Sequence, residues 1–207
     1  MSVYMIGAVE IHDPEGYELY RANVPPTLTP YLGKYETLSS DDNPLVLVGN
    51  QPANHLFINR YSSMDVLKEF YYSDAYQSVK HYRLESSTTS FIFAMKGLDE
   101  GRHETGEAAY MFAALEINDM DEYGVYRQHA TKAIAAFPEM SVLSADDHPL
   151  MLEGTQPANH LVLARFASVE RASEFYDSAL YQVATRHRVA ASDARFYMVM
   201  RSSEKAS

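Results

Sequence analysis

A run of six residues, Gln-Pro-Ala-Asn-His-Leu, occurs twice in the chain, at Gln51–Leu56 and again at Gln156–Leu161. An identical run of this length is not expected by chance, and it predicts an internal repeat. Matching residues continue around the run at an offset of 105, as Arg60 and Arg165 illustrate, and further upstream at an offset of 106, as Tyr4 and Tyr110 illustrate. Each copy has the length of one small domain with its own core. The repeat therefore predicts two related domains in one chain.

The boundary between these domains is expected where the composition changes. The stretch from Gly97 to Ala108 reads Gly-Leu-Asp-Glu-Gly-Arg-His-Glu-Thr-Gly-Glu-Ala, which is rich in glycine and acidic residues. Such a composition is typical of a flexible linker. We therefore place the first domain at residues 1–96, the linker at 97–108 and the second domain at 109–207.

The hydrophobic pattern predicts the same order of strands and helices in both copies. Tyr4–Ile11 and Tyr110–Ile117 are nearly continuous apolar runs, which is typical of strands buried on both faces. Asp13 followed by Pro14 predicts a helix start, because aspartate caps and proline fits the first turn. The expected elements, first copy and then second, are strands 4–11 and 110–117, helices 14–32 and 120–137, strands 34–38 and 140–143, strands 45–49 and 150–154, strands 55–61 and 160–166, helices starting at 63 and 168, helices 74–84 and 179–189, and strands 90–95 and 195–200.

This order corresponds to the β-α-β-β-α-β unit of ferredoxin-like α+β folds, whose helices cover only one face of an antiparallel sheet. The other face of each sheet is apolar and needs a cover. Since the chain supplies two copies, the economical arrangement packs the sheets against each other as a pseudo-twofold α+β barrel. We therefore expect a single-chain pseudo-dimer, and whether it forms a further homodimer is left open.

Composition limits the classes of partner. The net charge of −11 opposes binding to nucleic acid or to anionic lipid. No apolar run approaches the ~20 residues that span a bilayer, so we expect no membrane partner. The chain has no cysteine, which excludes disulfides, thiolate metal sites and cysteine nucleophiles. A cytoplasmic location is the expectation.

Several segments resemble a known bacterial family, named domain of unknown function 1330, in the dimeric α+β barrel superfamily. They are Asp13–Thr27, with Asp-Pro-Glu-Gly-Tyr-Glu-Leu-Tyr-Arg and Val-Pro-Pro-Thr, then His55–Ser63, and the Phe-Tyr-x-Ser-x-x-Tyr-Gln segments Phe70–Gln77 and Phe175–Gln182. The resemblance covers nearly all of both repeats. It implies the barrel and a pocket in each unit between the sheet and the helices.

The same resemblance implies no single reaction. Relatives in the superfamily include cofactor-free monooxygenases, polyketide cyclases, muconolactone-type isomerases and haem enzymes, and fold alone does not choose among them. The chain departs from the family at Leu32-Gly33 and Phe137-Pro138, where a glycine pair is usual. It also has His55 and His160 where a basic residue commonly opens the third strand, and its tandem arrangement differs from the usual single domain that dimerises.

Four residues are candidates for catalysis. His55 and His160 occupy matching positions in the two copies, and imidazole exchanges protons near pH 7. Glu10 and Glu116 are lone acids in apolar strands, and burial would turn either into a general base. The alternatives are a histidine that only fixes the loop and a glutamate at a solvated strand end, paired with an arginine.

Arginine and tyrosine residues are candidates for substrate binding. Arginine holds a carboxylate or enolate through paired hydrogen bonds, and tyrosine gives an apolar pocket a polar tip. A structural salt bridge to Glu10 or Glu116 is the alternative for the arginines. The candidates are Tyr20, Arg21, Tyr71, Tyr76 and Arg83 in the first copy, and Tyr126, Arg127, Tyr176, Tyr181 and Arg188 in the second. We expect Glu10, His55, Tyr20, Tyr76 and Arg83 to converge, and Glu116, His160 and Arg188 to form the equivalent site.

Other chemistries have little support in the sequence. Asp41-Asp42 and Asp146-Asp147 lie in proline-containing turns, where paired carboxylates are commonly turn formers, so no metal site is expected. No phosphate loop, serine elbow, zinc-protease motif or dinucleotide fingerprint is present. The sequence therefore favours a small-molecule enzyme without a bound cofactor that moves protons on an aromatic, polyketide-like or lactone-like metabolite. A non-catalytic metabolite-binding or structural protein, or a haem-binding one, is the alternative.

Overall fold

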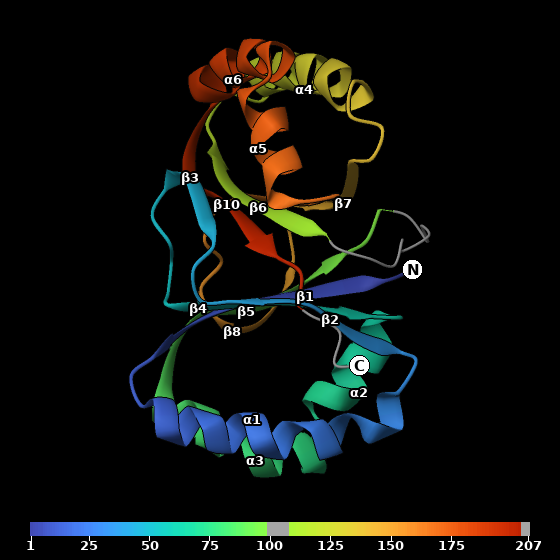
Figure 1. Ribbon diagram of the computed structural model, residues 1–207, viewed down its shortest axis with the longest axis vertical. Helices are drawn as coiled ribbons and strands as arrows, with labels where there is room; N and C mark the ends of the chain where they lie inside the picture. The colour runs from blue at the N-terminus through green and yellow to red at the C-terminus, as the bar shows by residue number, and fades with distance from the viewer. Residues whose placement is uncertain (99–107, 204–207) are drawn as a thin grey trace. The chain divides into compact units, whose positions relative to one another are not determined.

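The structure is a computed structural model that describes residues 1–98 and 108–203. It divides into two compact units, each with helices on one face of an antiparallel sheet (Figure 1). The first unit comprises β1 (Val3–Ile11), α1 (Pro14–Leu28), η1 (Thr29–Tyr31), β2 (Tyr35–Asp41), β4 (His55–Tyr61), α2 (Met64–Tyr71), α3 (Asp74–Ser86), β5 (Ser87–Lys96) and β8 (Leu150–Gly154). The second comprises β3 (Leu45–Gly49), β6 (Ala109–Ile117), α4 (Met120–Ala135), β7 (Ser141–Asp146), β9 (His160–Phe166), α5 (Val169–Asp177), α6 (Ala179–Ala191) and β10 (Ser192–Arg201). The predicted α+β class with two similar halves is confirmed.

The two sheets exchange a strand. The first has the order β2-β4-β1-β5-β8 and the second β3-β10-β6-β9-β7, so each sheet holds four strands of its own repeat and one of the other. The sequence led us to expect two contiguous domains, each with the strands on both sides of its Asp-Asp turn in one sheet. That expectation is wrong for β3 and β8, because the chain leaves its own sheet after this turn and pairs with the edge of the other unit's sheet. The unpaired edge of β5 or β10 supplies the backbone partners that make this exchange favourable.

A glycine ends each exchanged strand. Gly49 and Gly154 both have a φ of 72°. A Cβ on Gly154 would lie 2.2 Å from the backbone oxygen of Ser90, and a Cβ on Gly49 would lie 2.0 Å from that of Arg195. Only glycine allows both the left-handed conformation and this close approach. The position is therefore fixed by backbone sterics in both units.

The first helix forms as the sequence predicts. The Asp13 carboxylate accepts a hydrogen bond of 3.1 Å from the Gly16 N–H and caps α1. The two internal prolines, Pro25 and Pro26, do not end the helix, which runs to Leu28 and tightens into the 3-10 turn η1. Together α1 and η1 span nearly the expected range 14–32. In the second unit Asp119 caps α4 in the same way.

The face that β1 turns to the helices is not the face that carries Glu10, although the expected convergence of Glu10 with His55 requires it. Val3 and Met5 pack in the core cluster with residues of α2 and α3, whereas Tyr4, Ile6 and Ala8 are not part of it. Side chains alternate along a strand, so the odd-numbered residues of β1 face the helices. The second unit behaves alike, with the odd-numbered residues of β6 in its helix-side cluster. A strand that is apolar on both faces gives no sequence signal for its direction.

Two expectations concern segments or properties beyond these units. The linker placed at 97–108 lies largely outside the described residues. How the two sheets pack on each other stays a prediction. In the described ranges 1–98 and 108–203, no helix has the length and apolar character needed to cross a bilayer.

Candidate functional site

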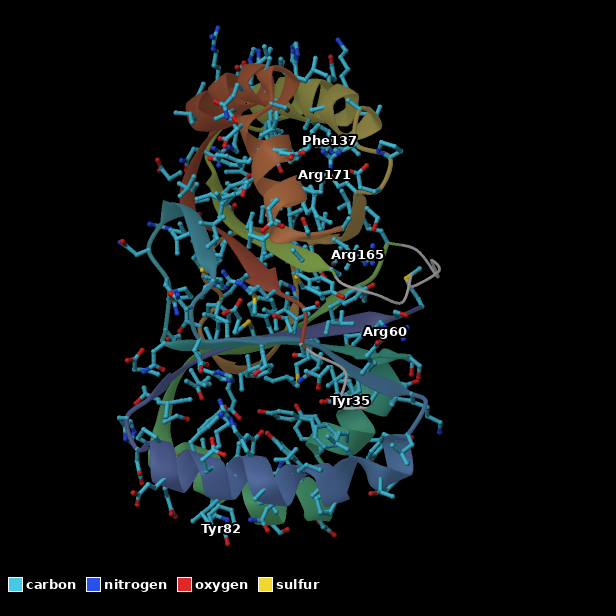
Figure 2. All side chains as sticks on the ribbon, viewed as in Figure 1. Tyr35, Arg60, Tyr82, Phe137, Arg165 and Arg171 are labelled. Carbon is cyan, nitrogen blue, oxygen red and sulfur yellow. The ribbon has the colours of Figure 1, made fainter. Side chains whose placement is uncertain are left out.

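The first unit contains a cavity of about 220 Å³ between its sheet and its helices. Tyr35 lies on this side of the sheet (Figure 2). The cavity has an apolar wall and a polar wall. The apolar wall includes Met5, Val24, Pro25, Leu28, Phe57, Phe70 and Ile92, and the polar wall includes Tyr17, Tyr20, Arg21, Tyr35, Thr37, Ser40, His55, Asn59, Tyr61, Tyr71 and Tyr76. An apolar pocket with a few converging polar groups is the usual form of a small-molecule site. The tyrosines therefore surround the space and do not fill it.

His55 lies on the wall of this cavity and is held by Asp42. The Nδ1 of His55 and Oδ1 of Asp42 are 2.5 Å apart, and only 4% of His55 is exposed. Because a carboxylate only accepts, Nδ1 carries the proton and Nε2 is the basic nitrogen of the neutral ring. Burial lowers the pKa of His55, while the bond to Asp42 opposes that effect. The pair thus orients a neutral imidazole.

Three tyrosines, Tyr17, Tyr20 and Tyr76, line the same cavity as this imidazole, and Tyr17 is in contact with it. The ring of Tyr17 meets His55 edge-on at 5.5 Å between centroids. Burial raises the pKa of Tyr17 to about 12 and that of Tyr20 well above its ordinary value, so both keep their proton at neutral pH. The hydroxyls of Tyr20 and Tyr76 lie 3.2 Å apart. Tyr17 and Tyr20 thus supply neutral hydrogen-bond donors to the cavity, and Tyr20, Tyr76 and His55 line this one cavity as predicted.

The far wall of the cavity is polar along β2 and β4. The Tyr35 hydroxyl lies 2.5 Å from Thr37 Oγ1 and donates to Asn59 Oδ1 at 3.3 Å. The hydroxyl of Tyr61 is buried and has no hydrogen-bond partner in the part of the chain that the structure describes. His55, Asn59 and Tyr61 share one face of β4 because side chains alternate along a strand. A buried unpaired hydroxyl beside a cavity favours a ligand with a polar group there.

The two glutamates are not part of this arrangement. Glu10 is exposed at the end of β1, where its carboxylate accepts a 2.9 Å hydrogen bond from the Asn54 N–H. Glu116 lies 4.0 Å from Arg195, with 34% of its side chain exposed. The predicted convergence of Glu10 with His55 is wrong, and the solvated strand end describes both glutamates. The strand reaches solvent before these residues, so burial does not act on them as expected.

Arg83 is on the helix side but is occupied by a residue from the other repeat. Its Nη2 donates to Glu153 Oε1 at 2.5 Å, and its Nη1 donates to Thr89 Oγ1 at 2.8 Å. Lys80 contacts the same carboxylate oxygen at 2.8 Å, and the Tyr71 hydroxyl donates to it as well. Burial opposes ionisation of Glu153, yet these cations and donors together lower its pKa to about 2. Arg83 therefore forms a structural network, with a different partner from the expected Glu10.

The equivalent Arg188 of the second unit has no carboxylate partner among the described residues. Its Nη2 donates to the Tyr176 hydroxyl at 3.2 Å, while its Nε and Nη1 are buried and make no hydrogen bond within that part of the chain. Only 2% of Arg188 is exposed. The ring of Tyr197 lies 4.3 Å from the guanidinium carbon. A desolvated cation-π contact supplies about 2 kcal/mol, less than the several kcal/mol that burying an ion costs.

Other residues of the second unit repeat part of the first. His160 Nδ1 is bonded to Asp147 Oδ1, and the hydroxyls of Tyr126 and Tyr181 are 3.2 Å apart. The polar wall is not repeated, since Val142 and Ala164 pair in the register that Thr37 and Asn59 occupy. Arg127 is exposed, while Arg21 is exposed at the cavity rim and bonded to Glu18 at 2.9 Å. The two units therefore have different polar groups in equivalent places.

Four residues that the structure places at or near these sites were not predicted from the sequence. Asp42 was interpreted as a turn former, yet it is the partner of His55. The signal was present, because both repeats place the aspartate 13 positions before the histidine. Asn59 and Tyr61 were overlooked because β4 was expected without knowledge of which face meets the cavity. Nothing in the sequence indicated that Glu153 would contact Arg83, because this contact depends on the strand exchange.

Comparisons with known proteins agree with this fold. The family described as "Domain of unknown function (DUF1330)" matches residues 2–97 and again 108–202. None of the curated proteins matches the chain. A proposed monooxygenase from Lactobacillus acidophilus NCFM superposes with a TM-score of 0.57 at 10% identity, covering 97% of this chain and 93% of that one.

Chlorite dismutase from Candidatus Nitrospira defluvii is similar to the same extent. A variant of it gives a TM-score of 0.61 at 10% identity, over 98% of this chain and 91% of that one. Its complex with imidazole gives a TM-score of 0.57 at 11% identity with the same coverage of 98% and 91%. At such low identity these likenesses concern the fold alone.

Proposed function

The chain belongs to the family described as domain of unknown function (DUF1330), and we propose that its first unit is an enzyme site for proton transfer on a small enolisable metabolite. The substrate class is aromatic, polyketide-like or lactone-like, and the reaction is an isomerisation, cyclisation or monooxygenase-like step that needs no bound cofactor. The single observation that carries this proposal is the Asp42-held His55 on the wall of a tyrosine-lined cavity.

The proposed chemistry follows from the protonation states. Nε2 of neutral His55 removes a proton from a carbon next to a carbonyl, and the electron pair of the C–H bond moves into an enolate. The resulting imidazolium is stabilised by the Asp42 carboxylate, because the two charges are in contact. The hydroxyls of Tyr17 and the Tyr20–Tyr76 pair donate hydrogen bonds to the enolate oxygen. Returning the proton from Nε2 to another carbon completes an isomerisation.

The size and polarity of the cavity support a small ligand. Its volume of about 220 Å³ is below the ~300–1,000 Å³ of pockets for drug-sized molecules. Tyr61, at the far wall, has a buried hydroxyl that makes no hydrogen bond within residues 1–98 and 108–203, and this hydroxyl would bind a second polar group of the ligand. Apolar side chains such as Phe57 and Ile92 lie between the two polar ends and would contact a planar body. The cavity therefore suits a flat metabolite with oxygens at both ends.

Haem binding has less support in this unit. A haem macrocycle is larger than a cavity of about 220 Å³, so the residues present do not fit the group. The similarity to chlorite dismutase concerns the fold alone, and no step of the proposed chemistry passes through a haem. Haem absorbs visible light, so a colourless purified protein is the expected result if no haem is bound.

Solvent-hydrogen exchange tests the proposal directly. Small β-diketones, hydroxyquinones and lactones are incubated with the protein in D₂O, and NMR follows deuterium entering the acidic C–H position. We expect catalysed exchange for at least one compound, and loss of roughly 10²-fold or more in His55→Gln, which removes the base. His160→Gln in the second unit is the matched control and keeps the rate.

The same experiment separates the enzyme from a protein that only binds. Ligand-observed NMR with the same compounds reports binding in the first cavity whether or not exchange occurs. Binding with no exchange above the buffer rate supports the metabolite-binding alternative. Exchange that survives in His55→Gln shows that His55 is not the base.

A further inference from the structure

The two repeats place an arginine at the same position but surround it differently. In the first unit the Glu153 carboxylate, from the exchanged strand β8, lies opposite Ile92 and accepts from Arg83. In the second unit the exchanged strand β3 places Val48 opposite Tyr197, in the same register. The position that holds a carboxylate in one unit therefore holds an isopropyl group in the other.

Each residue that donates a hydrogen bond to the Glu153 carboxylate has an equivalent position in the second unit. The four donors to Glu153 are Arg83, Lys80, Tyr71 and Thr89. Their counterparts, from the repeat spacing, are Arg188, Thr185, Tyr176 and Ala194. The last cannot donate. The first three retain side-chain donors, so most of the carboxylate's surroundings remain after the carboxylate is gone.

These remaining donors lack partners. Arg188 Nε and Nη1 and Thr185 Oγ1 are all buried with no hydrogen bond among the described residues. Arg188 and Thr185 lie three residues apart on α6, so their side chains share one face of the helix. A buried guanidinium with two nitrogens that make no hydrogen bond, on the same helix face as a hydroxyl that makes none, is a strong binding site for an anion.

The nearby tyrosines do not neutralise this charge. Burial raises the pKa of Tyr126 and Tyr181 well above their ordinary value, so they stay protonated at neutral pH. Tyr176 already accepts a hydrogen bond from Arg188 Nη2 and still has its own proton to donate. The site thus offers donors and one formal positive charge.

We propose that the second unit binds the carboxylate of a small organic acid, which occupies the place that the Glu153 carboxylate takes in the first unit. Arg188, Thr185 and Tyr176 hold the carboxylate oxygens. The ring of Tyr197, which lies over the guanidinium, and Val48, which is opposite Tyr197 in the paired strands, contact an apolar body. A single guanidinium matches a monocarboxylate. The site is separate from the cavity of the first unit, and it extends the proposed function without depending on it.

Access to this place differs between the units. Tyr71, which contacts Glu153, is 2% exposed, whereas its counterpart Tyr176 is only half-buried. Thr185 is also half-buried as a residue although its hydroxyl is covered. The second unit therefore has buried donor atoms next to two residues, Tyr176 and Thr185, that are partly exposed, and a ligand would enter there.

Isothermal titration of the full chain with benzoate tests the site, with benzamide as the neutral ligand of the same shape. We expect one benzoate per chain and no comparable binding of benzamide. Arg188→Met should weaken benzoate binding by more than about tenfold, because it removes the charge that the carboxylate meets. Val48→Glu should do the same, because it places an internal carboxylate where the ligand binds. Val46→Glu, on the same strand at an exposed position, is the matched control and should leave binding unchanged.

The outcomes separate this proposal from its rivals. Benzoate binding that persists in both Arg188→Met and Val48→Glu but is lost in a first-unit variant, Tyr61→Phe, overturns the site in the second unit. Equal binding of benzoate and benzamide overturns the role of charge. A third outcome is that the site takes only chloride. In that case titration with benzoate releases no heat of binding at any chloride concentration, and the proposal of an organic acid ligand is wrong. If Val48→Glu does not fold, Arg188→Met with its melting temperature as a folding check carries the test.

Discussion

Arg83 and Glu153 belong to different repeats, 70 positions apart, yet Arg83 Nη2 donates to Glu153 Oε1 over 2.5 Å. The exchange of β8 into the first sheet is what brings them together. Since Arg83 is 1% exposed and the Glu153 side chain 14%, this pair is shielded from solvent. It joins the second repeat to the first unit through a buried charge contact.

Removing one member of this pair is expected to destabilise the protein strongly. Glu153→Gln leaves the Arg83 guanidinium buried without its counter-ion, which costs about 3–5 kcal/mol in comparable sites. Urea unfolding measures the loss as a lower midpoint at unchanged slope. Glu174→Gln, at an exposed ion pair with Arg171, is the control and should change the unfolding free energy by no more than about 1 kcal/mol. Equal effects of the two variants would contradict a buried network.

The same pair predicts how stability depends on pH. The folded pKa of Glu153 lies near 2, below its ordinary value of 4.5, so its contribution is present above pH 4.5 and lost as the pH falls through 2. The difference corresponds to about 3 kcal/mol of unfolding free energy. Unfolding measured from pH 6 to pH 2 should show this loss in the wild type and a smaller one in Glu153→Gln. Identical pH profiles would contradict the assignment.

Asp42 is expected to set the titration of His55. The bond to Asp42 opposes the lowering of the His55 pKa by burial, so Asp42→Asn should lower that pKa further. NMR titration of the imidazole ring protons measures the shift. Asp65→Asn, on α2, is a control that keeps the His55 pKa. A rise of the pKa in Asp42→Asn would show that the carboxylate does not act on this ring.

Gly7 is expected to keep the cavity open. A Cβ at this position would lie 2.2 Å from the ring of Phe57, which is its partner in the β1–β4 register and lines the cavity. Gly7→Ala should therefore push that ring into the cavity and weaken ligand binding by more than about tenfold, at a stability loss of about 1–3 kcal/mol. Adding Phe57→Val, which copies the Ala113–Val162 pair of the second unit, should restore stability. No rescue in the double variant would contradict this explanation.

The first repeat alone is expected not to form a stable monomer. A chain of residues 1–98 lacks β8, so β5 keeps an open edge and Arg83 loses its carboxylate. We expect aggregation, or a dimer in which β3 of one copy pairs with β5 of the other. Size-exclusion chromatography with light scattering decides between these states. A well-behaved monomer with native-like solubility would contradict the need for the exchanged strand.

The sequence by itself determined the elements of this protein. Caps, hydrophobic periodicity and turns act within a few residues, so Asp13 predicted the start of its helix correctly. The repeat of the six-residue run predicted two similar halves, and the aligned histidine singled out His55, which lies at the cavity. These features depend on local physics that the sequence carries in full.

Only the tertiary structure decided which residues meet. β1 is apolar on both faces, so its alternation cannot tell which side meets the helices, and Glu10 was placed in the site wrongly. The partner of Arg83 depends on an edge of a sheet accepting a strand from the other repeat, a pairing that no local pattern encodes. The same exchange places Glu153 beside one arginine, and it places Val48 opposite Tyr197, whose ring lies over the other. The charge of each site is therefore set by long-range backbone pairing, and the sequence shows it only once that pairing is known.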